Sequence, residues 1–254
     1  MADAVLVEQR DRILIITINR PAARNAIDAA VTTGIAAAMD ELDERTDLSI
    51  GILTGEGGTF CAGMDLKAFL RGESVILPGR GLAGLTEAPP KKPLIAAVEG
   101  YALAGGCELV LSCDLVVAAD DARFGIPEVR RGLVAAAGGL IRLPRRIPPQ
   151  LAMEYALTGD FFSATDAQRY GLVNRVTLPG GALSGAVELA ERITANAPLA
   201  IAVTKAIIVR SADWSREEMF RRQDELIRPV FASADAREGA AAFAEKRPPA
   251  WRGE

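Results

Sequence analysis

Short apolar runs alternate with helical patterns along roughly the first 178 residues of this chain, and this alternation limits its fold more than any other feature. The runs expected to form strands are 5–7, 13–18, 49–54, 94–98 and 115–119. Apolar residues spaced by three and four predict an amphipathic helix over 26–45, and a second helix is expected from Gly105 to about Cys113. Strands that alternate with helices indicate an α/β protein.

Beyond about Leu178 the strand signals stop and only helices are expected. They are predicted over 183–195, 198–210, 216–231 and 236–246. We therefore divide the chain into an α/β core with the active site, residues 1–195, and a helical C-terminal region, residues 196–254. The apolar positions of this region exceed what one small bundle needs, so we expect part of it to pack on another subunit.

The chain contains no histidine, which excludes Ser-His-Asp and Cys-His nucleophilic schemes and nearly all zinc chemistry. Carboxylates, lysines, tyrosines or backbone dipoles would have to carry any acid–base catalysis. No metal site is expected. A net charge of −4 offers no electrostatic footprint for nucleic acid or an anionic membrane. Three cysteines in apolar or Gly-rich contexts, with no leader sequence and no apolar run of ~18 residues, lead us to expect a soluble cytoplasmic protein.

Three segments combine glycine with charge in apolar surroundings. The first, 60–66, reads as a strand-to-helix turn in which small residues let the backbone approach a ligand, although Asp65 could simply cap the helix. In the second, 100–111, Glu108 lies one turn into an apolar helix. A carboxylate there either complements the helix dipole or has a function that repays its burial.

The third segment, 122–132, places Glu128 after a proline that typically fixes the first turn of a helix. Glu128 could be another dipole-complementing acid, solvated by Arg130 and Arg131. Together, the three segments supply backbone N–H donors and two carboxylates without histidine or metal. Thioester enolate chemistry needs such a set, with donors aimed at the developing oxyanion and acid–base groups near Cα and Cβ.

The same residues carry a family resemblance. Over essentially its full length the sequence resembles the crotonase (enoyl-CoA hydratase/isomerase) superfamily. The matching blocks are Asn19-Arg20-Pro21, Asn25-Ala26, 60–66, 95–102, Gly105-Gly106-Cys107-Glu108, 124–128, Gly138-Gly139, 157–159, 171–173 and 243–247. The resemblance implies a spiral of ββα units with a helical C-terminal trimerisation region, assembled as a trimer or hexamer, and a role in fatty acid metabolism.

The resemblance also implies the site. The amides of Ala62 and Gly105 would form the oxyanion hole, and Glu108 and Glu128 would flank the catalytic water, with Glu108 activating it and Glu128 protonating Cα. Joint presence of both glutamates favours a hydratase, a hydro-lyase acting on trans-2-enoyl-CoA. Further substrate- or CoA-binding positions would be Ala23, Arg24, Ala26, Gly63, Met64, Asp65, Leu66, Tyr101, Gly106 and Pro127. Arg24, Lys67 and Lys246 are candidates for the CoA phosphates, and no cofactor is implied, since coenzyme A is part of the substrate.

Several alternatives stay open. Residues 63–68, 84–87, 147–149, 197–202 and 243–251 resemble the carnitinyl-CoA dehydratase-like branch. An enoyl-CoA isomerase of the same fold would need one working glutamate, and a non-catalytic acyl-CoA-binding protein would need none. The sequence departs from the family pattern at Ala104, where glycine is frequent, and at 135–139, and both departures put the acyl-chain preference in doubt.

Overall fold

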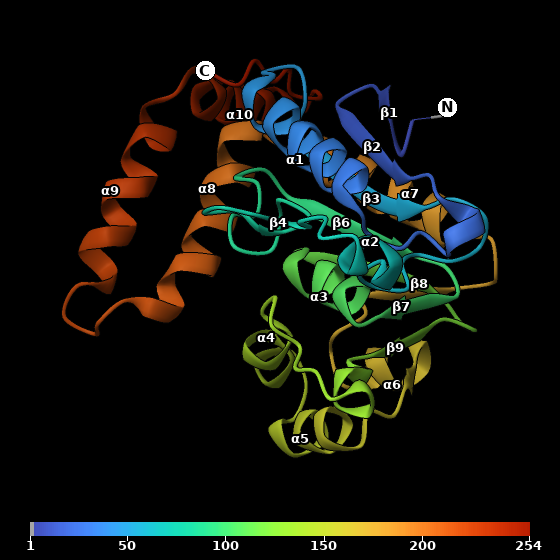
Figure 1. The fold of residues 1–254 in the computed structure, drawn as a ribbon. Helices are drawn as coiled ribbons and strands as arrows, with labels where there is room; N and C mark the ends of the chain where they lie inside the picture. Colours follow the sequence, from blue (N-terminus) through green and yellow to red (C-terminus); the bar gives the residue numbers. More distant parts are fainter. Residues whose placement is uncertain (1–2) are drawn as a thin grey trace.

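A six-stranded sheet forms the centre of the computed structural model, which describes residues 3–254 (Figure 1). Its strand order is β1-β2-β3-β6-β8-β11, with β1 and β2 antiparallel and the remaining neighbours parallel. The strands are β1 (Val5–Arg10), β2 (Ile13–Ile18), β3 (Ile50–Gly55), β6 (Leu94–Val98), β8 (Leu115–Ala119) and β11 (Arg175–Thr177). The predicted α/β class with a parallel sheet is therefore confirmed.

Apolar residues cover both faces of this sheet, as expected for parallel strands. Ile13 and Ile15 of β2 pack with α7 (Ala182–Thr194) on one face. The intervening Leu14 and Ile16 belong to the larger core on the other face, where α1 (Ala29–Glu44) and α3 (Gly105–Ser112) lie. Because successive strand side chains alternate between faces, one β-branched run serves both cores.

Two smaller sheets surround the end of the central sheet where α3 begins. One has the order β10-β9-β7, made by β10 (Phe162–Ser163), β9 (Arg123–Gly125) and β7 (Tyr101–Leu103). The other pairs β4 (Ile76–Leu77) with β5 (Gly81–Leu82). Short helices fill the intervening chain, namely α2 (Leu66–Leu70), α4 (Gly139–Arg146), α5 (Pro149–Thr158), α6 (Ala164–Arg169) and the 3-10 turns η1 (Pro21–Ala23) and η2 (Pro127–Arg131).

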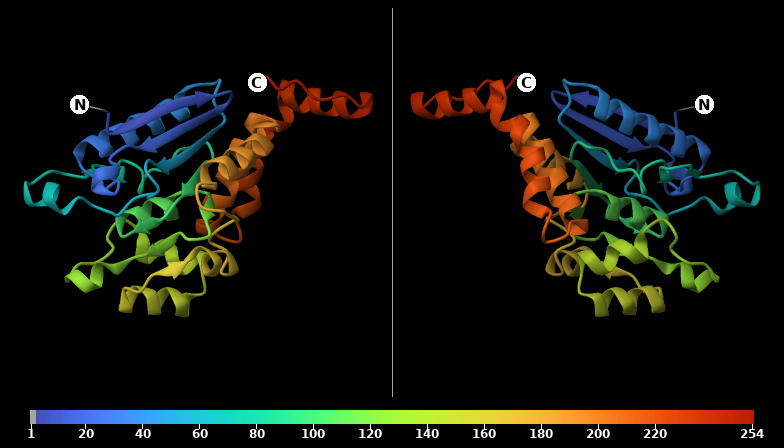
Figure 2. Two further views of the ribbon diagram at one scale, coloured as in Figure 1. Left: turned by 90° about the vertical axis from the view of Figure 1, so that its right-hand side faces the viewer. Right: turned by 90° about the vertical axis from the view of Figure 1, so that its left-hand side faces the viewer.

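The C-terminal region is helical, as predicted. It comprises α8 (Pro198–Arg210), η3 (Ser211–Asp213), α9 (Met219–Ala232) and α10 (Ala234–Glu245). Figure 2 shows α10 projecting from the body of the molecule on the side opposite α2. Within residues 3–254, no single helix is long and apolar enough to cross a membrane, although the bent pair 182–194 and 198–213 reaches that length and apolarity together.

Candidate active site

The N-terminus of α3 is the centre of the candidate site. Ala104, just before the helix, has φ 50° and ψ −125°, a conformation that L-residues rarely adopt. Its amide donates to the carbonyl of Gly125 at 2.9 Å, and its carbonyl accepts from the amide of Glu108 at 3.0 Å. These two bonds hold the strained residue in place, and Gly105 then starts the helix with its N–H directed away from the helical ladder.

The segment 61–65 passes very close to this helix start, and glycine makes the approach possible. A Cβ on Gly106 would lie 2.2 Å from the carbonyl oxygen of Cys61. Gly63 has φ 98°, and a Cβ there would lie 3.2 Å from the backbone nitrogen of Gly105. The backbones of both segments therefore meet without intervening side chains.

Segment 61–65 and the start of α3 together form what we call the crossing. Its backbone amides differ in whether they already donate a hydrogen bond, and one of them contradicts an expectation from the sequence. The N–H of Ala62 donates to the carbonyl of Arg24 at 3.0 Å, so it is not available to a substrate oxygen. The backbone of Ile27 bonds to the two neighbours of Met64. The Ile27 N–H donates to the carbonyl of Gly63, and the Asp65 N–H donates to the carbonyl of Ile27, each at 2.8 Å. The N–H of Met64 therefore points away from Ile27.

Among residues 3–254, neither Met64 nor Gly105 has a hydrogen-bond acceptor for its amide. Because both lie where Gly63 meets the start of α3, these two N–H groups are available donors at the crossing. Met64 was expected from the sequence as a substrate-binding residue. The direction of its N–H depends on the contact with Ile27, which no local pattern announces.

Glu108 lies in the first turn of α3 and is almost completely buried, with 3% of its surface exposed. Its Oε1 accepts hydrogen bonds from the amides of Ala137 at 2.7 Å and Gly139 at 2.9 Å. Burial, reinforced by the nearby negative charge of Glu128, raises the pKa of Glu108 to about 7, although these amide bonds oppose the rise. The carboxyl group can therefore exchange a proton near neutral pH.

Glu128 lies in η2, directly after the buried Pro127, so the predicted helical turn is present as a 3-10 turn. Its Oε2 is buried and has no hydrogen-bond partner among the described residues. Burial raises the pKa of Glu128 above its ordinary value, while its own backbone amide and the Arg131 charge oppose the rise. A buried carboxyl oxygen without a partner is costly unless it is protonated or meets a ligand.

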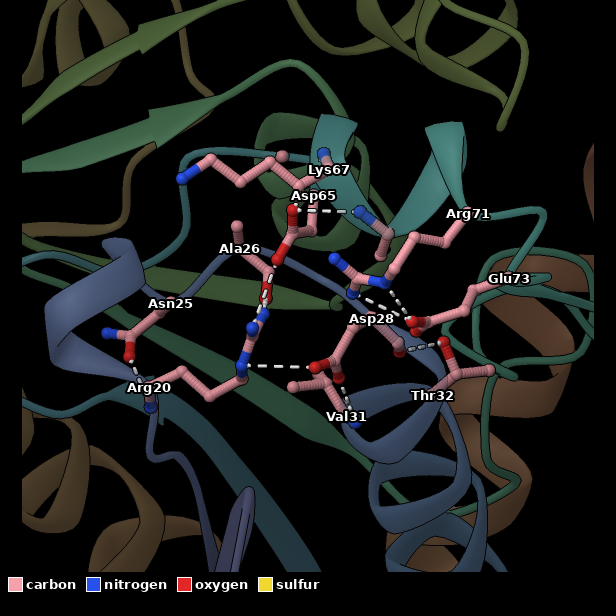
Figure 3. A network of polar contacts seen from close by, with 12 residues as sticks. Arg20, Asn25, Ala26, Asp28, Val31, Thr32, Asp65, Lys67, Arg71 and Glu73 are labelled. Carbon is pink, nitrogen blue, oxygen red and sulfur yellow. Dashed lines mark hydrogen bonds and ion pairs between the residues drawn. The ribbon is translucent and has the colours of Figure 1, made fainter.

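Arg20 ties together the two helices that border the crossing (Figure 3). Its guanidinium contacts Asp28, the N-cap of α1, at 3.1 Å and Asp65, the N-cap of α2, at 3.0 Å. Asp65 also accepts from the amides of Lys67 and Ala68, at 2.9 and 3.2 Å. The capping interpretation of Asp65 is therefore confirmed, and this cap fixes the chain direction just after Met64.

The loop before α1 carries the other predicted substrate-binding positions. Asn25, fully buried with φ 55°, donates to the carbonyls of Glu56 and Thr59 and accepts from the Arg20 amide. Ala23 ends η1 beside Arg24, which is exposed, and the carbonyl of Ala26 accepts from Arg20. This loop therefore adjoins the crossing through Arg24.

The remaining predicted positions are not all brought together. Leu66 and Lys67 are exposed at the start of α2, and Tyr101 is exposed on β7. Lys246 is the C-cap residue of α10, and α10 projects on the side opposite α2, the helix that carries Lys67 (Figure 2). Residues 3–254 contain no cluster of three or more acidic or cysteine side chains that could hold a metal.

Comparisons with known proteins identify the family of this chain. The enoyl-CoA hydratase/isomerase family profile matches residues 8–254. Over 259 residues the chain is 43% identical to the enoyl-CoA hydratase EchA19 of Mycobacterium tuberculosis, covering 96% of this chain and 94% of the relative. Over 262 residues it is 42% identical to a carnitinyl-CoA dehydratase of Salmonella arizonae, with both chains fully covered. A crystal structure of an enoyl-CoA hydratase from Mycobacterium tuberculosis, 64% identical, matches the whole of both chains with a TM-score of 0.98.

The chain therefore belongs to the enoyl-CoA hydratase/isomerase family, the crotonase family. The resemblance seen in the sequence, the fold it implied and an acyl-CoA thioester as the substrate class all agree with these matches. Within the family, the protein is an enzyme with a hydratase- or dehydratase-like lyase activity.

Proposed function

We propose that this protein is an enoyl-CoA hydratase, adding water reversibly to the double bond of a trans-2-enoyl-CoA. The observation that carries the proposal is the arrangement at the start of α3. Glu108 is buried, Glu128 is half-buried with one buried oxygen, and the pKa of each is raised. Glu108 lies in the same helical turn as Gly105, and the amides of Gly105 and Met64 have no acceptor among the described residues. In a chain without histidine, these are the groups suited to acid–base work on a thioester.

In this mechanism the thioester carbonyl oxygen accepts hydrogen bonds from the amides of Met64 and Gly105. As electron density moves onto that oxygen, Cβ becomes electrophilic, and the enolate formed when water adds to Cβ is basic at Cα. Each well-placed donor contributes about 10²–10³ in rate. Met64 replaces Ala62 in this role because the Ala62 amide is bound to Arg24.

The two glutamates complete the addition. Water oxygen forms a bond to Cβ, one water proton passes to ionised Glu108, and Cα receives a proton from Glu128. The substrate gains one water molecule, Glu108 ends protonated and Glu128 ionised, and proton exchange with solvent restores both groups. Glu108 suits the accepting role because two amides fix Oε1, which leaves Oε2 for the water. Glu128 suits the donating role because its unpartnered buried oxygen favours the protonated form.

Coenzyme A is carried by the substrate, and the proposal needs no separate cofactor or metal. Its phosphates would lie near Arg24 and Lys67, two exposed cations on either side of the crossing that make no ion pair within residues 3–254. Charge-reversing both residues should raise the KM for an enoyl-CoA strongly, with a smaller effect on an enoyl-pantetheine thioester that lacks the nucleotide.

We also propose that residues 196–254 assemble the protein into trimers or pairs of trimers. No residue of α8 or α9 is buried in the single chain, and Phe220, Phe231 and Phe243 are all more than two-thirds exposed. Exposed apolar surface of this kind marks a protein interface. Sedimentation should give at least three chains per particle, and Phe220→Glu with Phe231→Glu should release smaller species; a monomeric wild type would contradict the proposal.

Separate Glu108→Gln and Glu128→Gln variants test the chemistry. Each is expected to lower hydration of crotonyl-CoA by roughly 10²–10⁴, because each removes one acid–base group. Glu154→Gln, an exposed glutamate on α5, serves as the matched control. Full hydratase activity in Glu108→Gln would contradict the role given to Glu108. An isomerase, which needs one glutamate, would instead leave crotonyl-CoA unhydrated and move the double bond of a longer enoyl-CoA.

The carnitinyl-CoA dehydratase-like alternative uses the same chemistry on a different acyl group, and the relative from Salmonella arizonae keeps it open. A substrate series of crotonyl-, long-chain enoyl- and crotonobetainyl-CoA separates the two. Tight binding of CoA esters with no turnover of any member would favour a non-catalytic binding protein.

A further inference from the structure

Arg142, on α4, lies next to the turn 137–139, whose amides bind the carboxylate of Glu108. Its backbone N–H bonds to the Gly138 carbonyl at 2.8 Å, so it lies one helical turn beyond the Ala137–Gly139 segment. Its half-buried side chain folds back toward the helix start, as long helical side chains do. A Cβ on Gly138 would lie 2.2 Å from Nη1 of Arg142, so the guanidinium covers this glycine directly.

The guanidinium also reaches a second part of the site. Nη2 donates to the carbonyl of Thr86 at 2.5 Å, and Nη1 lies 3.5 Å from the carbonyl of Ala137. Thr86 is buried, and its hydroxyl accepts from the amide of Leu82 at 2.9 Å. A Cβ placed on Gly105 would lie 2.8 Å from Cδ2 of Leu82, so Leu82 packs directly against Gly105. One side chain thus connects the Glu108 turn to the segment that packs on the oxyanion amide.

We propose that Arg142 is a positioning residue, whose guanidinium fixes the Ala137–Gly139 turn relative to Thr86 and keeps a positive charge behind the carboxylate of Glu108. The inference rests on the proposed role of Glu108. The neighbouring charged and titratable groups are Glu128 on η2, which opposes ionisation of Glu108, and the Cys107 thiol on α3. Arg142 is the cation that favours the ionised form.

The electrostatics agree with the geometry. Burial lowers the pKa of Arg142, while the charge of Glu108 opposes that shift. A nearby opposite charge favours the ionised form of a carboxyl group and so lowers its pKa. Removing the guanidinium should therefore raise the pKa of Glu108 and loosen its turn, two effects that different readouts can separate.

The test measures the ionisation of Glu108 directly, without reference to turnover. Protein labelled with carboxyl-¹³C glutamate is titrated by infrared spectroscopy, and the Glu108 band is assigned by its loss in Glu108→Gln. Arg142→Met should move the Glu108 midpoint upward by about one pH unit, and lower kcat about tenfold with KM within twofold. Arg145→Met, on the same helix and exposed, is the control and should leave both unchanged.

A folded Arg142→Met protein with an unchanged Glu108 midpoint would overturn the inference. If Arg142→Met fails to fold, Arg142→Lys provides the test. It keeps the positive charge but loses the paired contacts with two carbonyls, so the Glu108 midpoint should stay near that of wild type while kcat falls several-fold. A wild-type kcat in that variant would also overturn the inference. If wild type does not hydrate enoyl-CoA but Arg142→Met still shifts the Glu108 midpoint, the proposed function fails and the positioning role stands.

Discussion

The carboxylate of Glu108, in the first turn of α3, accepts a hydrogen bond of 2.9 Å from the backbone amide of Gly139, the first residue of α4. Two helix starts therefore converge on one carboxyl group. Helix N-termini favour negative charge, yet burial outweighs this effect and raises the pKa of Glu108 to about 7. The group is held in position at a cost to the stability of the fold.

That cost predicts a pH-dependent gain in stability for Glu108→Gln. Between pH 4.5, the ordinary pKa, and pH 7, the folded protein binds a proton that the unfolded chain does not, so burying Glu108 destabilises the fold increasingly as pH rises. At pH 8, Glu108→Gln should be more stable than wild type by about 3 kcal/mol. Chemical denaturation at pH 8 and pH 5 measures the difference, which should fade at pH 5. A Glu108→Gln protein less stable than wild type at pH 8 would contradict the raised pKa of Glu108. The control Glu154→Gln should leave the free energy of unfolding unchanged.

The assignment of the oxyanion hole to Met64 predicts distinct effects of two backbone changes. Replacing an amide by an ester, through incorporation of an α-hydroxy acid, deletes a single N–H. An ester at Met64 should lower kcat/KM by about 10²–10³ with little loss of stability. An ester at Ala62 removes the 3.0 Å bond to Arg24 and should cost about 1 kcal/mol of stability while kcat is kept. The reverse pattern would restore Ala62 to the oxyanion hole.

The strained backbone of Ala104 predicts a stabilising substitution. With φ 50° and ψ −125°, this residue occupies a region suited to glycine. Ala104→Gly should raise the free energy of unfolding by about 1 kcal/mol, since relief of strain exceeds the added chain entropy. Ala102→Gly, in the adjoining strand β7 and buried, should instead lower it by about 1 kcal/mol. Denaturant titration measures both, and loss of stability in Ala104→Gly would show that the strain is absent.

The position of Arg20 predicts that the two helix caps depend on one side chain. Arg20→Met leaves Asp28 and Asp65, both mostly buried, without their cation. Stability should fall by about 2 kcal/mol, and the KM for an enoyl-CoA should rise because Asp65 fixes the chain after Met64. Arg71→Met, which breaks an exposed pair with Glu73, should change stability by less than about 0.5 kcal/mol. Equal effects of the two substitutions would refute the role of Arg20.

Elements with strong local patterns could be predicted from the sequence. The run 13–18 is β2 as predicted, and the helices expected over 183–195 and 198–210 are α7 and α8 with boundaries shifted by at most one residue. The cap at Asp65 followed from residue type and position alone. Such features depend on neighbours in sequence, so their signals survive without the fold.

Other features depend on distant segments and left no local signal. β7 and β9 have three residues each and pair with one another; β9 also pairs with β10, and Ala102 of β7 forms a bridge with Cys61. Helix α4 contains Pro144, which weakens its pattern. The amides that hold Glu108 come from 29 and 31 residues further along the chain. The direction of the Met64 N–H is likewise set by Ile27, and the bond from the Ala62 N–H to Arg24 also joins segments far apart in sequence, so no local pattern could show which N–H group is free.

The most direct test of the central claim follows the atoms of water into the product. Crotonyl-CoA is incubated with the enzyme in D₂O enriched in ¹⁸O, and the product is analysed by mass spectrometry. Hydration predicts one ¹⁸O on Cβ and one deuterium on Cα, at rates reduced by roughly 10²–10⁴ in Glu108→Gln and Glu128→Gln. No ¹⁸O incorporation by the wild type, with deuterium entering a repositioned double bond of a longer enoyl-CoA, would contradict hydration.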